Sequence, residues 1–403
     1  MNNNFDIIIV GGGLIGLSTA FKIQKQLPDK RILLLEKEKL LASHQSGRNS
    51  GVLHSGLYYK PGSLKSQNCV LGRRELVDFA KRYKVNHDVC GKLVVATNQK
   101  EKNTLEILSQ TGLDNGLKDL KILNRNEIKE IEPFVEGLSA ILVSETGIID
   151  YRQVAEKLAF LITSINSDSK ILMDSEVIDF TDEESSSTVI TRSDQFYCKN
   201  IIFCAGLFSD RLAQKENVNL DLKIVGFRGD YYVLTDEAKH KVKNLVYPVP
   251  NPEFPFLGVH FTRMTNGHIE CGPNAVFTFK REGYKKLDFS IKDTLDALNY
   301  VGTWRLFKNH WRFGLNELVK ASSKRVFLNH LRRLIPSLKM NDIVPGRSGV
   351  RAIALGKDGD AIDDFKIISI RKNIHVLNAP SPAATACLSI GESVFKEFLK
   401  HQN

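Results

Sequence analysis

The stretch that decides the fold is Phe5-Asp6-Ile7-Ile8-Ile9-Val10-Gly11-Gly12-Gly13-Leu14-Ile15-Gly16, in which an apolar strand runs directly into glycines spaced Gly-x-Gly-x-x-Gly. Apolar residues at helical spacing follow the third glycine, which predicts a helix. A second apolar strand, Arg31 to Leu35, ends at Glu36, 20 residues past Gly16. Strand, glycine turn, helix, strand and acid at this spacing predict a β-α-β unit that binds a dinucleotide.

Each part of this unit has a physical task. Gly11 permits the tight turn, Gly13 lets the backbone approach a pyrophosphate at the positive end of the helix, and Gly16 lets helix and strand pack closely. The Glu36 carboxylate accepts hydrogen bonds from a ribose diol and repels a 2′-phosphate. The alternative is a glycine-rich turn in another kind of α/β protein, since the glycine spacing alone is weakly specific.

The overall composition is that of an ordinary globular protein. A chain of 403 residues is too long for one simple core, so two lobes are expected. No apolar run is long enough to span a bilayer, and the first core strand begins at residue 5, so we expect no leader and a cytoplasmic location. The six scattered cysteines predict no disulfide framework, and no metal site is expected.

The net charge of +10 is concentrated in residues 304–340, which hold nine Lys or Arg and one acid, interleaved with aromatic residues. One interpretation is a solvated helical face whose aromatics Trp304, Phe307, Trp311 and Phe313 lie in the core. The other is an interfacial patch that binds anionic lipid at the inner face of the cell membrane. Nucleic-acid binding is not expected, because no recognised module surrounds the patch.

The periodicity along the rest of the chain predicts further elements. A small antiparallel ribbon is predicted over 170–191, a strand-rich block with a hairpin at Asn266-Gly267 over 222–272, and helices over 289–338. Other helices are predicted over 63–83, 151–165 and 382–399, and other strands over 92–97, 200–204, 350–355, 366–370 and 374–377. The nucleotide-binding module is therefore expected to be discontinuous, with the substrate pocket between the two lobes.

The loop Ser43–Tyr59 favours a flavin over a nicotinamide cofactor. The loop is long and rich in small and polar residues, whereas a nicotinamide dehydrogenase would continue its parallel sheet at this point. Backbone donors and small residues of this kind suit an extended ribityl chain.

Four stretches carry a resemblance to a known group. They are His44–Lys65, Tyr247–Pro250 with Phe256–Arg263, Gly346–Ala352 and Asn378–Ala386. In them the chain resembles the glycine-oxidase and D-amino-acid-oxidase superfamily of FAD proteins, and within it the L-2-hydroxyglutarate oxidase (dehydrogenase) family. One departure is Ala352-Ile353-Ala354, where the family pattern has Ala-Gln-Ala.

The resemblance implies an α/β fold: a Rossmann-type, glutathione-reductase-like FAD-binding domain with a second substrate domain of mixed antiparallel sheet plus helices. The predicted FAD-binding domain comprises 1–85, 150–215 and 345–403. The predicted substrate-binding domain comprises 86–149 and 216–344.

The resemblance also implies which residues bind FAD, which we expect to be held non-covalently. The stretch Asn378–Ala384 leads into the helix predicted over 382–399, which is expected to point its free N–H groups at the flavin. The full set of predicted cofactor residues is Gly11, Gly13, Leu14, Ile15, Gly16, Glu36, Lys37, Ser43, Ser46, Arg48, Asn49, Ser50, Val177, Ala205, Gly206, Pro382, Ala383 and Ala384.

The implied reaction is oxidation of L-2-hydroxyglutarate to 2-oxoglutarate, which needs a base for the hydroxyl proton and cations for the carboxylates. An imidazole suits the base, and we favour His260 over His54. Among the cations we favour Arg351, because a guanidinium clamps a carboxylate bidentately. Further predicted substrate contacts are Tyr58, Tyr59, Lys60, Arg228 and Arg263.

Quinone or O2 is the expected electron acceptor. The alternatives are a sister FAD enzyme for an amino acid such as glycine or sarcosine, or for glycerol 3-phosphate, an NAD-dependent dehydrogenase, and a non-catalytic flavin-holding or lipid-surface module.

Overall fold

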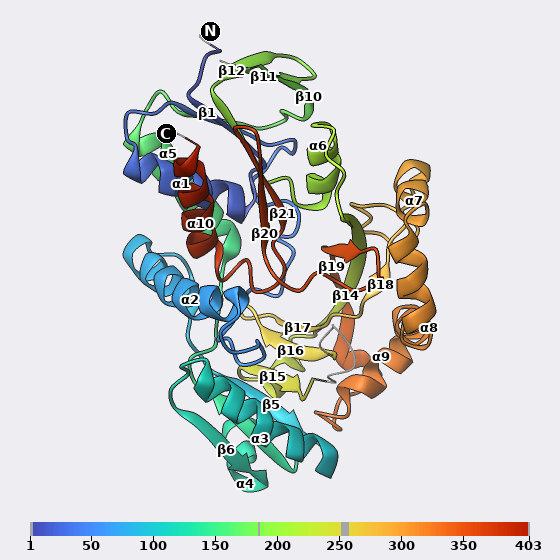
Figure 1. Cartoon of the computed structure of the whole chain (residues 1–403). Helices are drawn as coiled ribbons and strands as arrows, with labels where there is room; N and C mark the ends of the chain where they lie inside the picture. The colour runs from blue at the N-terminus through green and yellow to red at the C-terminus, as the bar shows by residue number, and fades with distance from the viewer. Residues whose placement is uncertain (1–2, 184–185, 251–257, 402–403) are drawn as a thin grey trace.

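The computed structural model describes residues 3–183, 186–250 and 258–401, so Phe256 and Leu257 of the quoted motif lie outside the described residues. Its first layer is a mainly parallel sheet, in which only the edge strand β20 runs antiparallel to its neighbour. Figure 1 shows this sheet at the top of the molecule, near both chain ends. The strand order is β20 (Lys366–Ile370), β21 (Asn373–Asn378), β13 (Asn200–Phe203), β1 (Ile7–Val10), β2 (Ile32–Leu35) and β9 (Lys170–Leu172).

Both faces of this sheet are covered, which explains why β1, β2 and β13 are continuous apolar runs. On one face, α1 (Leu14–Gln26) packs between α5 (Tyr151–Ile165) and α10 (Cys387–Lys400). The other face packs on an antiparallel ribbon of β10 (Val177–Asp182), β11 (Ser187–Thr191) and β12 (Gln195–Cys198).

The second layer is a larger mixed sheet below the first. Its strand order is β18 (Val276–Phe277), β14 (Leu222–Leu234), β17 (Ile269–Gly272), β16 (His260–Arg263), β15 (Leu245–Pro248), β5 (Lys92–Ala96), β7 (Ser139–Val143) and β6 (Leu120–Asn124). The long strand β19 (Ile343–Gly356) pairs along β14. The helices that accompany this sheet are α3 (Gln99–Asp114), α4 (Arg125–Ile131), α7 (Ile291–Leu298), α8 (Val301–Ser322) and α9 (Lys324–Leu331).

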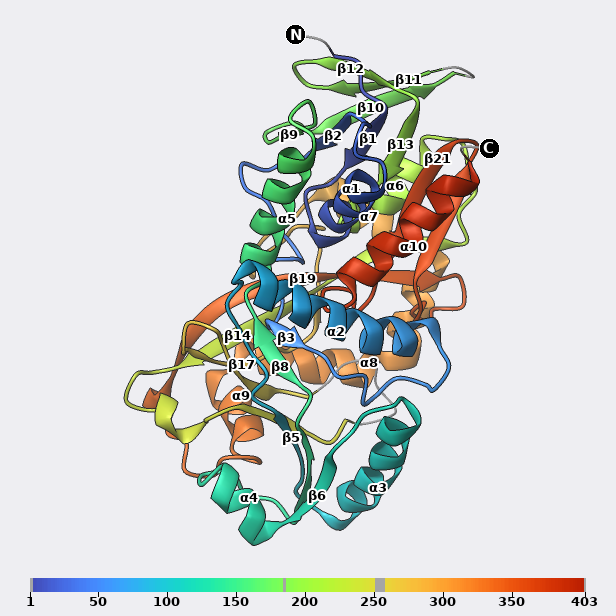
Figure 2. The ribbon, with the colours of Figure 1, turned by 90° about the vertical axis from the view of Figure 1, so that its left-hand side faces the viewer.

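Between the layers lie α2 (Leu64–Tyr83) and a small sheet of β3 (Val52–Leu53), β8 (Gly147–Ile149) and β4 (His87–Asp88), as Figure 2 shows. The remaining helical segments are α6 (Ser209–Gln214) and 3-10 turns at Gly206–Phe208, Lys239–Lys241 and Met340–Asp342. Side-chain caps fix the starts of two long helices: Ser63 accepts from Ser66 N at 3.1 Å, and Asp150 accepts from Arg152 N at 3.0 Å.

The predicted fold class is confirmed, with two local corrections. Lys170–Leu172 is not part of the predicted ribbon, because it pairs in parallel with β2 and closes the first sheet. The last helix begins at Cys387 and not at Pro382, because residues 381–386 form turns. The predicted domain boundaries stay a prediction, and β19 links the segment 345–403 to the larger sheet.

None of the helices in the described ranges is long and apolar enough to cross a bilayer. The expectation that the aromatics of 304–340 lie in the core is wrong for the two tryptophans. Trp304 is 57% exposed and Trp311 is 59% exposed, while Phe307 and Phe313 are half-buried. The solvent-facing side of α8 is therefore apolar as well as basic.

Candidate functional site

The turn between β1 and α1 accepts only glycine at two of its fingerprint positions. Gly11 has φ +113°, and a Cβ there would lie 2.3 Å from Cys204 O. A Cβ on Gly16 would lie 2.0 Å from Gly11 O. A side chain at either position would displace backbone, so the glycines keep the turn tight against β13 and leave its outer side open.

Glu36 directly follows β2 beside this turn and is buried. Its Oε2 accepts from Gly12 N at 2.7 Å, and its Oε1 accepts from Glu38 N at 2.9 Å. These bonds hold the carboxylate at the mouth of the glycine turn, where the fingerprint places a ribose. The next residue, Lys37, pairs with Glu282 and lies 4.4 Å from the centre of the Phe208 ring.

The polar loop 43–50 is ordered against the start of α1. Ser46 Oγ accepts from Leu14 N at 2.9 Å. The Asn49 side chain closes the loop, donating to Ser46 O at 2.8 Å and accepting from Gly51 N at 2.8 Å. Arg48 donates from Nε to Ser43 O at 3.0 Å.

Two residues that the sequence reasoning missed tie this loop to the larger sheet. Arg347 of β19 donates to Gly47 O at 2.8 Å and to Asn49 O at 2.6 Å, and it pairs with Glu270. Gln45 Oε1 accepts from Ala352 N at 2.9 Å. Both contacts join segments about 300 residues apart in sequence, so no local pattern indicates them.

Two imidazoles lie where the layers meet, and of these His260 is buried and His54 is half-buried. His54 directly follows β3, and its backbone N donates to Thr385 Oγ1 at 3.0 Å. His260 begins β16, its ring stacks on Tyr247 with centroids 3.8 Å apart, and its Nδ1 bonds Gly258 O at 2.8 Å. Because a carbonyl only accepts, His260 Nδ1 carries the hydrogen and Nε2 is left as an acceptor.

Burial, together with nearby cations, lowers the pKa of both imidazoles to about 3. For His54 the cations that contribute, after burial, include Lys92 and Arg351, and the same two act on His260. Both rings are therefore neutral at pH 7 and able to accept a proton.

Arg351, on β19, borders the same space. It hydrogen-bonds the buried Tyr231, whose pKa is raised mainly by burial. Tyr247 stacks on His260 and hydrogen-bonds Ser50. Burial raises the pKa of Tyr247, and the positive charge of Arg351 acts in the opposite direction. The structure thus brings His54, His260, Arg351 and Ser50 together.

The two tyrosines that follow His54 differ in their surroundings. The Tyr58 hydroxyl accepts from Lys92 Nζ at 3.3 Å. Tyr59 hydrogen-bonds Ser381, and the centre of its ring lies 5.2 Å from Lys65 Nζ. Burial raises the pKa of both phenols, so they stay protonated donors.

The family model of FAD-dependent oxidoreductases, named DAO, matches residues 6–395. Curated relatives are L-2-hydroxyglutarate dehydrogenases. That of Indibacter alkaliphilus is 45% identical over 98% of this chain and 99% of its own, and that of Escherichia coli K12 is 41% identical over 97% and 92%. The human mitochondrial protein is 40% identical over 98% and 89%. The chain belongs to the DAO family, in its L-2-hydroxyglutarate dehydrogenase group.

Solved DAO-family structures share the fold. L-alpha-glycerophosphate oxidase from Mycoplasma pneumoniae, solved with FAD bound, superposes with a TM-score of 0.80 at 23% identity over 98% of this chain and 95% of its own. Glycine oxidase from Geobacillus kaustophilus gives 0.73 at 16% identity over 99% and 95%.

FAD is the DAO-family cofactor, and the residues present fit it. The glycine turn is a cradle that a Cβ at Gly13 would narrow, since that Cβ would lie 3.0 Å from Ser46 Oγ. Glu36 offers a carboxylate at its mouth, and Gly206 follows β13 with φ +53°. Val177 lies at the start of β10, beside the same sheet.

The C-terminal segment predicted to face the flavin lies against His54. Thr385 Oγ1 accepts from Tyr151 or donates to it at 3.0 Å, besides accepting from His54 N. Asn378 donates to Ile362 O at 2.8 Å and to Asp364 O at 2.9 Å, which fixes the entry to the turns. Pro382, Ala383 and Ala384 lie in these turns, ahead of the helix itself.

Three predicted substrate contacts have solvent or an acidic side chain as their neighbour. Lys60 is exposed, Arg263 pairs with Asp88, and Arg228 pairs with Asp230 at 2.9 Å. Ile353, at the departure from the DAO-family pattern, packs with Val225 and Leu355.

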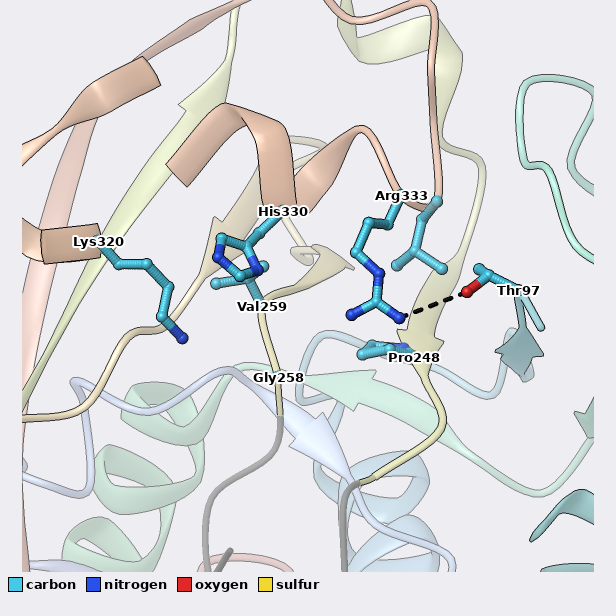
Figure 3. A pocket seen from close by; sticks show the side chains of 8 residues that line it. Thr97, Pro248, Gly258, Val259, Lys320, His330 and Arg333 are labelled. Atoms are coloured by element: carbon cyan, nitrogen blue, oxygen red, sulfur yellow. Dashed lines mark hydrogen bonds between the residues drawn. The ribbon is translucent and has the colours of Figure 1, made fainter. Parts of the chain in front are cut away.

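A separate surface pocket lies beside the start of β16. Figure 3 shows its basic side chains Lys320, His330 and Arg333, with Arg333 donating to Thr97. Gly258 and Val259 line it, but His54, Lys92 and His260 do not. The pocket therefore adjoins the histidine site without being part of it.

Proposed function

We propose that the protein oxidises L-2-hydroxyglutarate to 2-oxoglutarate and passes the electrons on to a quinone or to O2. The observation that carries this proposal is a pair of neutral imidazoles, His54 and His260, beside the guanidinium of Arg351. It lies in a chain whose curated relatives at 40–45% identity are L-2-hydroxyglutarate dehydrogenases.

The glycine turn, Glu36 and the loop 43–50 would hold the cofactor, together with the turns around Thr385. FAD, when bound, supplies the acceptor for the hydride that leaves Cα. The backbone N–H groups of the turn and loop are positioned in advance by the bonds of Ser46, Asn49 and Arg347. Little ordering of the protein is then needed on binding.

His260 takes the hydroxyl proton at Nε2. Its Nδ1–H bond to Gly258 O fixes the tautomer, and stacking on Tyr247 fixes the ring. As the proton moves to Nε2 and the hydride leaves Cα, the C–O single bond becomes the carbonyl of the product. His54 is the alternative base.

Arg351 binds the carboxylate next to the reacting carbon. Its guanidinium offers two parallel N–H donors, and Tyr231 helps to orient it. Clamping that carboxylate presents the hydroxyl group to the imidazoles.

The test is anaerobic reduction of the purified yellow protein. L-2-Hydroxyglutarate bleaches the flavin absorbance, and the D enantiomer does not. Bleaching by glycine, sarcosine or glycerol 3-phosphate instead assigns a sister activity. Retention of colour with L-2-hydroxyglutarate rejects the proposal.

We also propose that α8 contacts an anionic membrane surface, where a quinone is available. The backbone of α8 is non-helical at His310, which divides the helix into two segments. Helical spacing places Trp304 and Lys308 on one face of the first segment, and Trp311, Leu315 and Leu318 on one face of the second. All five side chains are exposed.

Charge complementarity argues for lipid as the occupant of these faces. Arg305 and Arg312 flank the apolar residues and are exposed, as is Lys308 among them. On the neighbouring α7, Ile291 and Leu295 are also exposed. Tryptophan and basic residues on one exposed helix face are typical of a helix lying in the headgroup region of a membrane.

A further inference from the structure

Lys92 is a buried charge that the mechanism above does not use. It is the first residue of β5, and its exposed fraction is 2%. Its ammonium donates to the Tyr58 hydroxyl at 3.3 Å and lies 4.4 Å from the centre of the Tyr58 ring. The Tyr247 ring is 5.1 Å away on another side.

Among the described residues, no carboxylate lies within ion-pair distance of Lys92. The other lysine that is buried in this part of the chain does have an acidic partner. That lysine, Lys65, is 8% exposed and pairs with Asp363. A buried ammonium with only a phenol and aromatic faces is costly to keep charged. Burial accordingly lowers the pKa of Lys92 to about 7.

Lys92 adjoins the reacting groups. Among the charged neighbours that lower the pKa of His54, Lys92 has the largest effect, and it also acts on His260. Arg351 acts on the same two rings from β19. Lys65 of α2 also lowers the pKa of His54, with a smaller effect than Lys92 or Arg351, and does not act on His260. Lys92 and Arg351 are therefore the two cations that act on both imidazoles.

We propose that Lys92 binds the second carboxylate of the substrate, the one at C5, while Arg351 binds the first. This inference rests on the proposed function, because it assumes a dicarboxylate substrate. The planar fork of Arg351 suits the carboxylate that must be oriented for reaction, and the single ammonium of Lys92 suits a carboxylate that needs only a point charge.

In this arrangement, substrate binding also raises the basicity of the two imidazoles. A dianion neutralises both cations, which removes the charges that oppose a proton on His54 or His260. The imidazoles become stronger bases once both carboxylates are in place, and a monocarboxylate leaves Lys92 uncompensated.

The test compares two ligands that cannot be oxidised, glutarate and valerate, which differ in one carboxylate. Binding to the FAD-loaded protein is followed by the change in flavin absorbance. K92M is expected to weaken glutarate binding by roughly 10- to 100-fold, the usual value of a charged hydrogen bond, and to change valerate binding less than about threefold.

Two variants serve as controls. K65M removes a buried lysine that already has an acidic partner, and it should keep the wild-type preference for glutarate. K92R retains a positive charge and should recover part of that preference. K92Q replaces K92M if the latter loses FAD.

The outcomes separate the two proposals. Equal weakening of glutarate and valerate, or unchanged glutarate binding, overturns the role of Lys92. A glutarate preference that depends on Lys92, in a protein that L-2-hydroxyglutarate fails to reduce, supports the dicarboxylate site and rejects the proposed reaction. A purely structural lysine would lower the Tm on substitution, whereas removal of an uncompensated buried charge leaves it unchanged or raises it.

Discussion

His260 and His54 differ in how their side chains are held. A backbone carbonyl fixes the His260 tautomer, and Tyr247 covers its ring. For His54 the backbone is held instead: its N donates to Thr385 Oγ1, and its carbonyl oxygen accepts from the Cys69 thiol at 3.3 Å. An oriented acceptor nitrogen on a rigid strand is what a general base requires.

The first prediction concerns these two rings. H260A lowers the rate of anaerobic flavin reduction by about 10²–10⁴-fold, and H54A lowers it less, because only the first removes the oriented proton acceptor. Stopped-flow absorbance measures both rates, with FAD content as the control for folding. A larger loss in H54A would assign the base to His54.

The second prediction concerns pH. Lys92 must be protonated to hold a carboxylate, and its pKa in the ligand-free protein is about 7. Binding of glutarate therefore weakens as pH rises through about 7 and is strongest below it, whereas binding of valerate stays flat. Flavin absorbance titrations between pH 6 and 9 measure both.

The groups packed around Lys92 do not titrate in that window. The pKa values of His54 and His260 are about 3, the pKa of Cys69 is raised to about 12, and those of Tyr58 and Tyr247 are raised further by burial. Arg351 stays charged throughout. A flat profile for glutarate would contradict the role given to Lys92.

At the scale of elements, β19 connects the cofactor loop to the larger sheet. Gly349 lies against Arg48, and a Cβ there would be 2.3 Å from the Arg48 carbonyl oxygen. Together with the bonds from Arg347 and to Ala352, this close contact fixes the position of the loop 43–50.

The third prediction follows from this contact. G349A pushes the loop away from β19 and weakens FAD binding by at least about tenfold, the usual effect of overpacking a tight contact. FAD retention after gel filtration measures it. G314A, in open space on α8, is the matched control, and it should keep FAD and stabilise the helix by about 0.5–1 kcal/mol.

The parts of the fold that the sequence predicts well are those whose signals are local. Residues 151–165 show helical periodicity and form a helix of the same bounds, and Glu36 follows its strand as expected. Lys92 and Arg347 were missed. A lysine at the start of an apolar strand is indistinguishable in sequence from an ordinary flanking residue. Arg347 hydrogen-bonds a loop that lies 300 residues away in sequence, so no local pattern indicates the contact.

Across the whole molecule, charge and exposed apolar area gather on one side. Figure 1 shows α7, α8 and α9 together along the edge of the larger sheet. The exposed tryptophan side chains there are unfavourably hydrated, and burial against a partner surface would remove that free-energy cost.

The fourth prediction tests this side. W304S/W311S lowers binding to vesicles of anionic lipid by at least about tenfold, because two large apolar groups no longer enter the bilayer. Vesicle co-sedimentation measures it, and added salt weakens the wild-type binding. F160S, which removes an exposed aromatic on α5, is the matched control.

A second copy of the chain could cover the same face instead. Self-association that W304S/W311S abolishes, with no binding to anionic vesicles, would contradict the membrane proposal.

The first sheet joins strands from the start, the middle and the end of the polypeptide, since β1 pairs with β13 and β13 pairs with β21. During translation the glycine turn emerges hundreds of residues before α10, which packs on α1. Coenzyme capture must then await nearly complete synthesis. A premature stop ahead of Cys387 leaves the apolar side of α1 uncovered, and such a fragment is prone to aggregation or proteolysis rather than partial activity.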